Sequence, residues 1–299
     1  MESRKICKLL ILIFLVLSLL FYYLYNAEIK KRTVIPDELV LSAVQNLESR
    51  GIEIDESVIQ KVTPERDIYC FDVSEKSDFH KNITSSLFTS IFTNEVVTTE
   101  FDTPDGYSVG IYDKSSSEKE LGRILFSQND NSFVFSKNGL SMKNGDEPIE
   151  NMQTDDVTEE IAAFIEKTVV DLTNGYKLGY RIKGSSSNDM YLIVTVMQTI
   201  DGSDISNAYM NFVFQDDELV ILYSDWICDS PKAMYHNTLL DGVNVLYKLR
   251  LDDVKEIISQ EVVYTSKNSN DNKGFIIPCW RIRYLDKNEK IVTEYFDAL

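Results

Sequence analysis

The sequence has few of the residues on which metal sites and nucleophilic active sites are usually built. Its 299 residues include only two histidines and four cysteines. His80 and His236 lie in no HExxH pattern, and the cysteines form neither a CxxC pair nor a Cys/His ligand set, which argues against a zinc site. The GxSxG, P-loop and GxGxxG patterns are also absent. We therefore expect no catalytic residue, no metal and no cofactor, and we expect both histidines to lie at the surface.

Positive charge is also scarce. The chain has 30 Lys and Arg residues against 48 Asp and Glu residues, which gives a formal net charge of −18. Phosphate contacts need a basic face, so we expect no nucleic-acid partner. Cys70, Cys228 and Cys279 are an odd number of widely spaced thiols, which allow one disulfide or three buried thiols. The chain does not resemble a disulfide-stapled protein, so the spacing favours buried thiols.

One long uncharged run, from Leu9 to Ala27, stands out from the rest of the sequence. A helix of about 19 residues, with a rise of ~1.5 Å per residue, is long enough to cross the hydrocarbon core of a bilayer. The apolar core of this run ends in Tyr22, Tyr23, Leu24 and Tyr25 and not in the small residues of a cleavage site, so it predicts an uncleaved anchor in preference to a cleaved signal peptide or a buried core helix. The residues expected to anchor the chain are Leu9, Ile13, Leu17, Ser18, Phe21, Tyr22 and Tyr25.

The shortness of the segment before this run predicts the orientation of the chain in the membrane, because the three positive charges on each side of the run nearly cancel. Residues 1–8 form a small tail with no domain to retain it outside, so we expect a single-pass protein of the cell membrane. The N-terminus is expected in the cytoplasm, and the large C-terminal part is expected outside the cell.

Hydrophobic periodicity predicts the elements that follow. Val40, Ala43, Val44 and Leu47 recur at i, i+3, i+4 and i+7, which is typical of an amphipathic helix. Further helical patterns cover residues 79–92 and 156–173, and a partly helical stretch opens at Ser230 and Pro231. Alternating patterns predict strands at 68–73, 95–102, 107–113, 122–127, 132–136, 176–183, 190–200, 206–215, 219–227, 255–265, 275–285 and 290–296.

These elements predict an α+β fold in which a single N-terminal transmembrane helix precedes helix-plus-antiparallel-meander units. The expected domains are a cytoplasmic tail (1–8), the transmembrane helix (9–27), a first extracytoplasmic α+β domain (28–141), a linker (142–152) and a second domain (153–299). The second domain divides into two repeats of one helix followed by a meander, at 153–227 and 228–299.

Three short stretches carry a resemblance to a known family. They read Ile35-Pro36-Asp37-Glu38-Leu39, Ile277-Pro278-Cys279-Trp280-Arg281-Ile282 and Tyr295-Phe296-Asp297-Ala298. With the N-terminal span, they resemble the YycH/YycI family of membrane-anchored regulators, the YycI branch most closely, and the layout is also similar to PepSY-like domains. Asp297 stands where the family usually has Asn, and Cys279 stands where it usually has a small aliphatic residue.

The resemblance implies regulation without catalysis. It implies that the chain binds and modulates a two-component sensor histidine kinase of cell-wall homeostasis in Gram-positive bacteria, beside a sister regulatory protein. It assigns structural roles to Pro278, Trp280, Arg281, Tyr295 and Ala298, with Trp280 expected as a core anchor. Other functions stay open: a ligand- or peptide-binding sensor that accepts an extended strand at a sheet edge, a structural spacer, or a less favoured anchored hydrolase whose triad is assembled in space.

Overall fold

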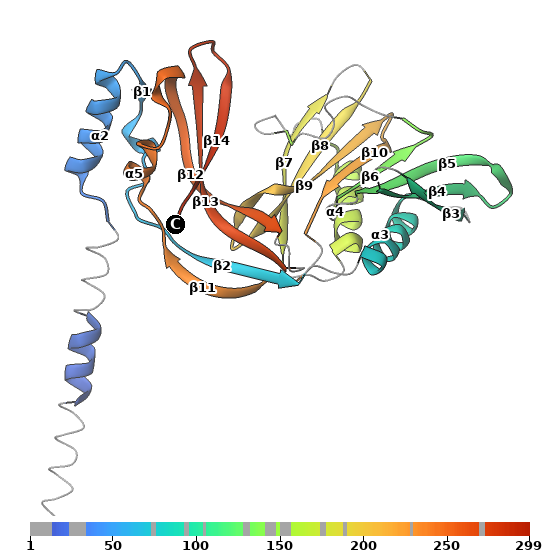
Figure 1. The fold of residues 1–299 in the computed structure, drawn as a ribbon, viewed down its shortest axis with the longest axis horizontal. Coiled ribbons are helices and arrows are strands. Elements are labelled where there is room, and N and C mark those ends of the chain that lie inside the picture. Colours follow the sequence, from blue (N-terminus) through green and yellow to red (C-terminus); the bar gives the residue numbers. More distant parts are fainter. Residues whose placement is uncertain are drawn as a thin grey trace, which may run out of the picture. The chain divides into compact units, whose positions relative to one another are not determined.

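The structure of the protein is a computed structural model (Figure 1). It describes residues 14–23, 34–72, 76–92, 96–103, 106–127, 132–140, 148–149, 157–173, 178–187, 190–227, 230–268 and 273–299.

Strands dominate the described part of the chain. The helices are α2 (Asp37–Ser49), α3 (Lys76–Ile91), α4 (Glu159–Thr173) and the short α5 (Gly242–Leu246), with 3₁₀ turns η1 (Glu56–Val58) and η2 (Leu251–Asp253). The strands are β1 (Glu53–Ile54), β2 (Glu65–Asp72), β3 (Val96–Thr103), β4 (Gly106–Asp113), β5 (Ser116–Ser127), β6 (Phe133–Lys137), β7 (Gly179–Ser187), β8 (Leu192–Ile200), β9 (Ser203–Gln215), β10 (Glu218–Asp225), β11 (Lys232–Thr238), β12 (Val254–Asn268), β13 (Lys273–Asp286) and β14 (Ile291–Asp297).

The predicted fold class is wrong. Hydrogen bonding joins the strands into one 14-stranded sheet, and separate helix-plus-meander units are not formed. The sheet is mixed, because β1 and β9 each pair with β12 in parallel, whereas the pairs of β9 with β10 and β8 are antiparallel. The predicted helical stretch after Pro231 is instead the strand β11, and only Gly242–Leu246 of that region is α-helical. Consecutive strands still pair as antiparallel meanders in β3 to β6 and in β7 to β10, but pairing between distant strands joins them into the one sheet, which the sequence pattern did not predict.

The expected transmembrane helix also differs from what the structure describes. Residues 14–23 are helical and exposed, and within the described parts of the chain no helix is both long enough and apolar enough to cross a membrane. Leu17, Ser18, Phe21 and Tyr22 lie in this short helical segment. The other expected anchor residues, Leu9, Ile13 and Tyr25, lie outside the described residues.

The chain forms two compact units that differ from the predicted domains. Unit 1 comprises Met1–Arg66, His236–Val262 and Cys279–Leu299, and unit 2 comprises Asp67–Tyr235 and Val263–Pro278. Each unit is therefore assembled from segments that are distant in the sequence. The predicted linker, residues 142–152, lies outside the described residues except for 148–149.

Unit 1 has its own hydrophobic core beneath α2. The predicted apolar stripe of this helix is confirmed, because Val40, Ala43, Val44 and Leu47 are all buried. Pro36 precedes the helix and Asp37 and Glu38 occupy its first turn, where acidic side chains favour the helix dipole. Gly51 follows the helix with φ +80°, a left-handed conformation that glycine adopts without strain. The stripe packs in one cluster with apolar side chains of α5, β12 and β13.

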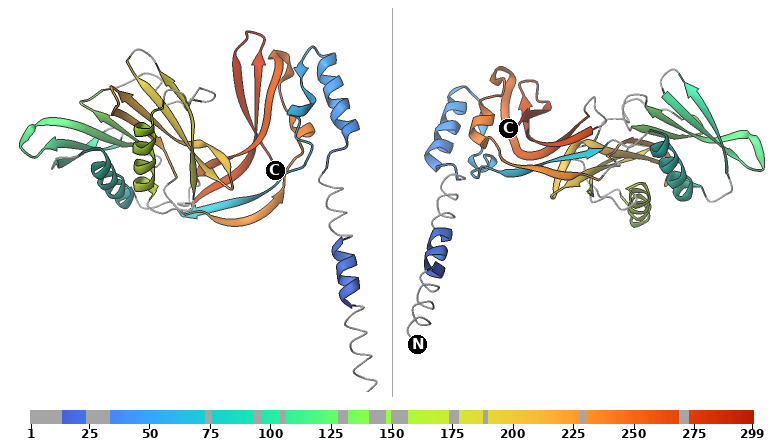
Figure 2. Two further views of the ribbon diagram at one scale, coloured as in Figure 1. Left: turned by 180° about the vertical axis from the view of Figure 1, so that it is seen from behind. Right: turned by 60° about the horizontal axis from the view of Figure 1, so that its bottom comes forward.

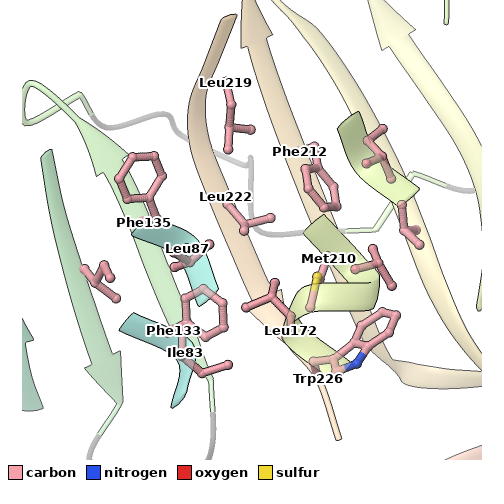
Figure 3. Packing of buried hydrophobic residues seen from close by; sticks show 14 of the residues in the cluster. Ile83, Leu87, Phe133, Phe135, Leu172, Met210, Phe212, Leu219, Leu222 and Trp226 are labelled. Atoms are coloured by element: carbon pink, nitrogen blue, oxygen red, sulfur yellow. The ribbon is translucent and has the colours of Figure 1, made fainter. Parts of the chain in front are cut away.

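Unit 2 has a larger core between its helices and its sheet (Figure 3). The strands β8, β9, β10, β6, β5, β4 and β3 are neighbours in this order, and α3 and α4 cover one face of them (Figures 1 and 2). Apolar side chains from both helices meet side chains from the sheet in one cluster. Its members include Ile83, Leu87, Phe133, Phe135, Leu172, Met210, Phe212, Leu219, Leu222 and Trp226.

Some buried polar groups of unit 2 are satisfied by the backbone. The Gln198 amide donates a hydrogen bond to the Ile227 carbonyl (2.8 Å) and accepts one from the Ile227 N–H (3.0 Å). Gln198 is completely buried and lies on β8, whereas Ile227 follows the end of β10. This side chain therefore ties the segment after β10 to a strand that is not its neighbour in the sheet.

Cys70 is half-buried and Cys279 is buried, and neither forms a disulfide in the part of the chain that the structure describes. Cys228 lies outside the described residues. The expectation of thiols in place of a disulfide therefore stays a prediction.

Candidate functional site

A pocket of about 490 Å³ lies in unit 2, where α3 passes over the β3–β4 hairpin. Pockets of roughly 300–1,000 Å³ are typical of small-molecule sites. We call this cavity the His80 pocket. Its lining residues are His80, Lys81, Thr84 and Ser85 from α3, Glu100 from β3, and Tyr107 and Val109 from β4.

The periodicities of a helix and a strand place these side chains together. In α3, Ile83 and Leu87 are buried in the core, which fixes the rotation of the helix. In β4, alternation places Tyr107 and Val109 on the same face of the sheet. Glu100 pairs directly with Val109 in the antiparallel register of β3 and β4, so it extends the same face toward the edge strand.

An aromatic stack forms one side of the pocket. The ring of His80 lies parallel to that of Tyr107, with centroids 4.8 Å apart and an angle of 6° between the planes. The His80 ring also packs on Phe126, with centroids 4.2 Å apart. His80 is therefore half-buried and packed, which corrects the expectation of a surface side chain. His236, by contrast, is an exposed residue of β11, 3.3 Å from a carboxylate oxygen of Glu65.

Two opposite charges line the pocket. The Tyr107 hydroxyl donates a hydrogen bond to Glu100, and desolvation together with this bond raises the pKa of Tyr107 to about 12. Lys81 is exposed on α3. Both charged side chains are described, and no ion pair joins the Lys81 ammonium to the Glu100 carboxylate. The charges therefore remain available to groups on a bound molecule.

A second cavity, of about 760 Å³, uses residues on the opposite side of the same strands. Ser108 lies between Tyr107 and Val109, is almost completely buried, and its hydroxyl has no hydrogen-bond partner in the described structure. Arg123 lines this cavity and is bound through two nitrogens to the Glu120 carboxylate. Because this ion pair neutralises the guanidinium, the cavity presents fewer uncommitted charges than the His80 pocket.

The residues that carry the family resemblance lie on two paired strands of unit 1. In the antiparallel register of β13 and β14, Trp280 faces Phe296 and Arg281 faces Tyr295. The two stretches, which are separate in the sequence, are therefore neighbours in the structure. β14 pairs with β13 and with no other described strand.

Trp280 is a core anchor, as expected. It is completely buried in the unit 1 cluster, and its Nε1 donates a hydrogen bond to the Leu240 carbonyl at 3.0 Å. Arg281 is also buried and binds the Glu261 carboxylate at 2.8 Å. Ala298 is buried in the same cluster as Trp280. These contacts assign Trp280, Arg281 and Ala298 to the interior of unit 1.

Pro278 lies where β13 changes its partner. Residues up to Ile276 pair with β2, and residues from Cys279 pair with β14. Proline has no N–H to donate to a ladder, so it suits a position between two pairings. Pro278 lies inside β13, which begins at Lys273.

A metal site is not found within the described part of the chain, where no group of His, Cys, Asp and Glu side chains is arranged to hold an ion. A third cavity, of about 460 Å³ in unit 1, is lined by Glu48, Glu53, Asp55 and Glu256. An acidic lining of this kind is typical of solvated element ends in a chain with 48 acidic residues.

Comparisons with known proteins give fold-level likeness only. No family model matches the sequence. No curated protein matches it either. An uncharacterized protein from Eubacterium rectale ATCC 33656 is similar in structure, with a TM-score of 0.49 and 13% identity, over 83% of this chain and 87% of that chain. The Bacillus megaterium YpeB C-terminal domain has a TM-score of 0.35 and 13% identity, over 76% of this chain and 94% of that chain.

The likeness to the YpeB domain is weak. Its TM-score describes a partial likeness of fold and supports no argument about function. The YycH/YycI resemblance stays a prediction, since no sequence family matches.

Proposed function

We propose that this chain is a membrane-attached regulatory protein without catalysis, whose extracytoplasmic part binds and modulates a two-component sensor histidine kinase. The residues of the YycH/YycI resemblance and the uncharged run from Leu9 to Ala27 support this proposal. In the proposed arrangement the run holds the chain at the cell membrane with its N-terminus in the cytoplasm. A sister regulatory protein is the second partner that the resemblance implies.

The observation that carries the proposal is the exposed edge of β14. This strand has one described neighbour, β13, and its Ile291 and Tyr295 side chains are 57% and 44% exposed. A sheet edge of this kind is a template for the addition of a strand from another protein. β14 also lies in unit 1, the unit that contains the residues directly following the uncharged run. We therefore propose that the kinase contacts the chain at β14.

Co-purification with a sensor histidine kinase of the same cell, the proposed partner, tests the contact. Replacing Ile291 and Tyr295 with Lys places two charges on the proposed interface, and we expect at least a tenfold loss of bound kinase, as for two central interface residues. The matched control is Val97→Lys with Phe101→Lys on β3, a second edge strand whose two apolar side chains are also exposed. Equal loss in both pairs of variants, or no loss in the β14 pair, would refute β14 as the contact.

The uncharged run is tested separately. Within lipid, helices associate through shape and polar groups, because apolar burial gives little driving force there. Replacing residues 1–27 with an unrelated span should reduce co-purification if the run contacts kinase helices. Kinase autophosphorylation in proteoliposomes, measured with and without the full chain, tests whether binding modulates the kinase. An unchanged rate at saturating chain contradicts the regulatory function.

A second candidate function is that of a sensor that binds a small ligand, and the His80 pocket favours it. The cavity combines apolar walls with a few polar groups, as ligand sites usually do. The test is a thermal-shift screen of the full chain against a broad set of small molecules, with Ser85→Trp as the control because tryptophan at this lining position fills the cavity. A sensor requires compounds that stabilise the wild-type chain and not Ser85→Trp, and a screen without such compounds rejects this function.

A further inference from the structure

The His80 pocket has the chemistry to recognise a particular class of ligand, and this inference rests on the second candidate function, the ligand sensor. Its two charged residues come from different elements, Lys81 from α3 and Glu100 from β3. Because no ion pair joins them, neither charge is neutralised by the other. Each of these two side chains can therefore bind an opposite charge on a ligand.

Part of the lining of the pocket is apolar. Val109 is almost completely buried, and the stacked rings of His80 and Tyr107 line the same pocket. An apolar or aromatic group placed against this part of the lining loses its contact with water and gains packing on the rings. This part of the pocket therefore favours an uncharged, hydrophobic body.

Hydroxyl groups lie on the side of Lys81. Thr84 and Ser85 follow Lys81 by one turn of α3 and line the same cavity. An ammonium with neighbouring hydroxyl groups is suited to a carboxylate, because charge-assisted hydrogen bonds are the stronger ones. From β3, the Glu100 carboxylate accepts a hydrogen bond from the Tyr107 hydroxyl, and its remaining lone pairs can bind a cation.

We propose that the His80 pocket binds a small zwitterion with an apolar side chain, namely a free amino acid or a short peptide of this kind. Its ammonium lies at Glu100, its carboxylate lies at Lys81 and the hydroxyls of Thr84 and Ser85, and its side chain packs on Val109 and the rings. A ligand with only a negative charge would be repelled by the Glu100 carboxylate, and a ligand with only a positive charge would be repelled by the Lys81 ammonium. A neutral apolar guest would bury both charges without partners, which costs free energy.

The experiment measures the affinity of the full chain, in detergent micelles, for three related probes by isothermal titration calorimetry and saturation-transfer NMR. L-phenylalanine carries both charges, N-acetyl-L-phenylalanine lacks the ammonium, and L-phenylalaninamide lacks the carboxylate. In the wild-type chain we expect L-phenylalanine to bind about three- to tenfold more tightly than either derivative, as for one partly exposed charged contact.

Two charge-neutralising variants identify which residue reads which end of the ligand. Glu100→Gln keeps an acceptor for the Tyr107 hydroxyl, and it should abolish the preference for L-phenylalanine over the N-acetyl derivative while the preference over the amide persists. Lys81→Gln should do the reverse. Glu159→Gln and Lys167→Gln on α4 are the matched controls, because both side chains are exposed and outside the pocket, and they should change neither ratio.

The outcomes separate this proposal from the functions above. Equal affinity for L-phenylalanine and both derivatives would refute the proposal that the ligand is a zwitterion. Preferences that persist in both Glu100→Gln and Lys81→Gln would also refute it, as would absence of binding by all three probes. The ligand-sensor function would then still be tested by the thermal-shift screen. Loss of L-phenylalanine binding in Ser85→Trp is expected, and retained binding would place the ligand outside the His80 pocket. The co-purification of the kinase is independent of all these results.

Discussion

The two hydrogen bonds between Gln198 and Ile227 allow a quantitative prediction for the Gln198→Met variant. Methionine fills a similar volume but can neither donate to the Ile227 carbonyl nor accept from its N–H, which are now bound at 2.8 and 3.0 Å. Leaving a buried polar group without a partner costs about 1–3 kcal/mol, so two such groups, less the gain from burying a thioether, destabilise unit 2 by roughly 2–5 kcal/mol. The variant tests whether this side chain holds the segment after β10.

Thermal unfolding followed by circular dichroism measures this effect. A loss of 1 kcal/mol lowers the melting temperature by about 2–4 °C for a unit of this size, so we expect a decrease of roughly 4–20 °C. Hydrogen exchange should also become faster at the Ile227 amide, because its acceptor is removed. A destabilisation below about 1 kcal/mol would refute the reasoning, since it would show that the Ile227 groups find other partners at little cost.

Gln198→Glu is the matched control, because it has the same shape and a titratable group. Burial raises the pKa of such a carboxyl above its unfolded value, and its protonated form can still donate to the Ile227 carbonyl and accept from the N–H. The variant should therefore be nearly as stable as the wild-type chain at low pH. Its stability is expected to fall as the pH rises through the folded-state pKa, whereas that of Gln198→Met should not follow this titration.

Three further predictions follow from contacts in the two units. Trp280→Phe removes the donor to the Leu240 carbonyl in the buried core of unit 1, and denaturant unfolding should show a loss of about 2–4 kcal/mol; a loss below 1 kcal/mol contradicts a core role. Leu222→Ala opens a cavity in the unit 2 core and should cost about 2–5 kcal/mol in the same assay, and an unchanged midpoint would contradict the packing in Figure 3. Tyr107, with a folded-state pKa of about 12 against 10 when unfolded, contributes stability that is complete below pH 10 and is lost as the pH rises toward 12. Absorbance at tyrosinate wavelengths should show this late titration, and its absence in Tyr107→Phe is the control.

Local patterns in the sequence predicted the elements of this fold well. The stripe of α2 is visible in the spacing of Val40, Ala43, Val44 and Leu47, because a helix that buries one face must repeat its apolar residues every three to four positions. The strands β8 to β10 and β12 to β14 agree with the predicted strands to within a few residues. Their alternation and the turns between them are local features.

Pairing between distant strands could not be predicted in the same way. β11 has no clear alternation and is exposed at most of its positions, so its neighbour β2 in the sheet, and not its own pattern, makes it a strand. The parallel pairings of β1 and β9 with β12 could not be predicted either, because the periodicity of a strand's sequence does not identify the strand with which it pairs. The predicted fold class was wrong for this reason.

The candidate site was missed for a related reason. His80 and Tyr107 are separated by the whole of β3, and only the folded chain stacks their rings. The sequence contained one usable signal, since Tyr107 and Val109 alternate in a strand that pairs with an edge strand. The sequence did identify Trp280 as a core residue, because Trp280, Ile282 and Tyr284 recur at every second position of a strand pattern and therefore share one face.

The division of unit 1 among three segments has a consequence for biosynthesis. Residues 34–66 leave the ribosome early, but the core that they enter also needs Trp280, Ile282 and Ala298, which are made more than 200 residues later. Folding units usually mature in the order in which they are synthesised. Here the last segment of unit 2 ends at Pro278, so unit 2 has all its residues before unit 1 does. A premature stop at Cys279 would therefore leave every residue of unit 2 in the chain. It would remove Trp280, which packs in the same core as α2, so α2 would lack part of its hydrophobic core.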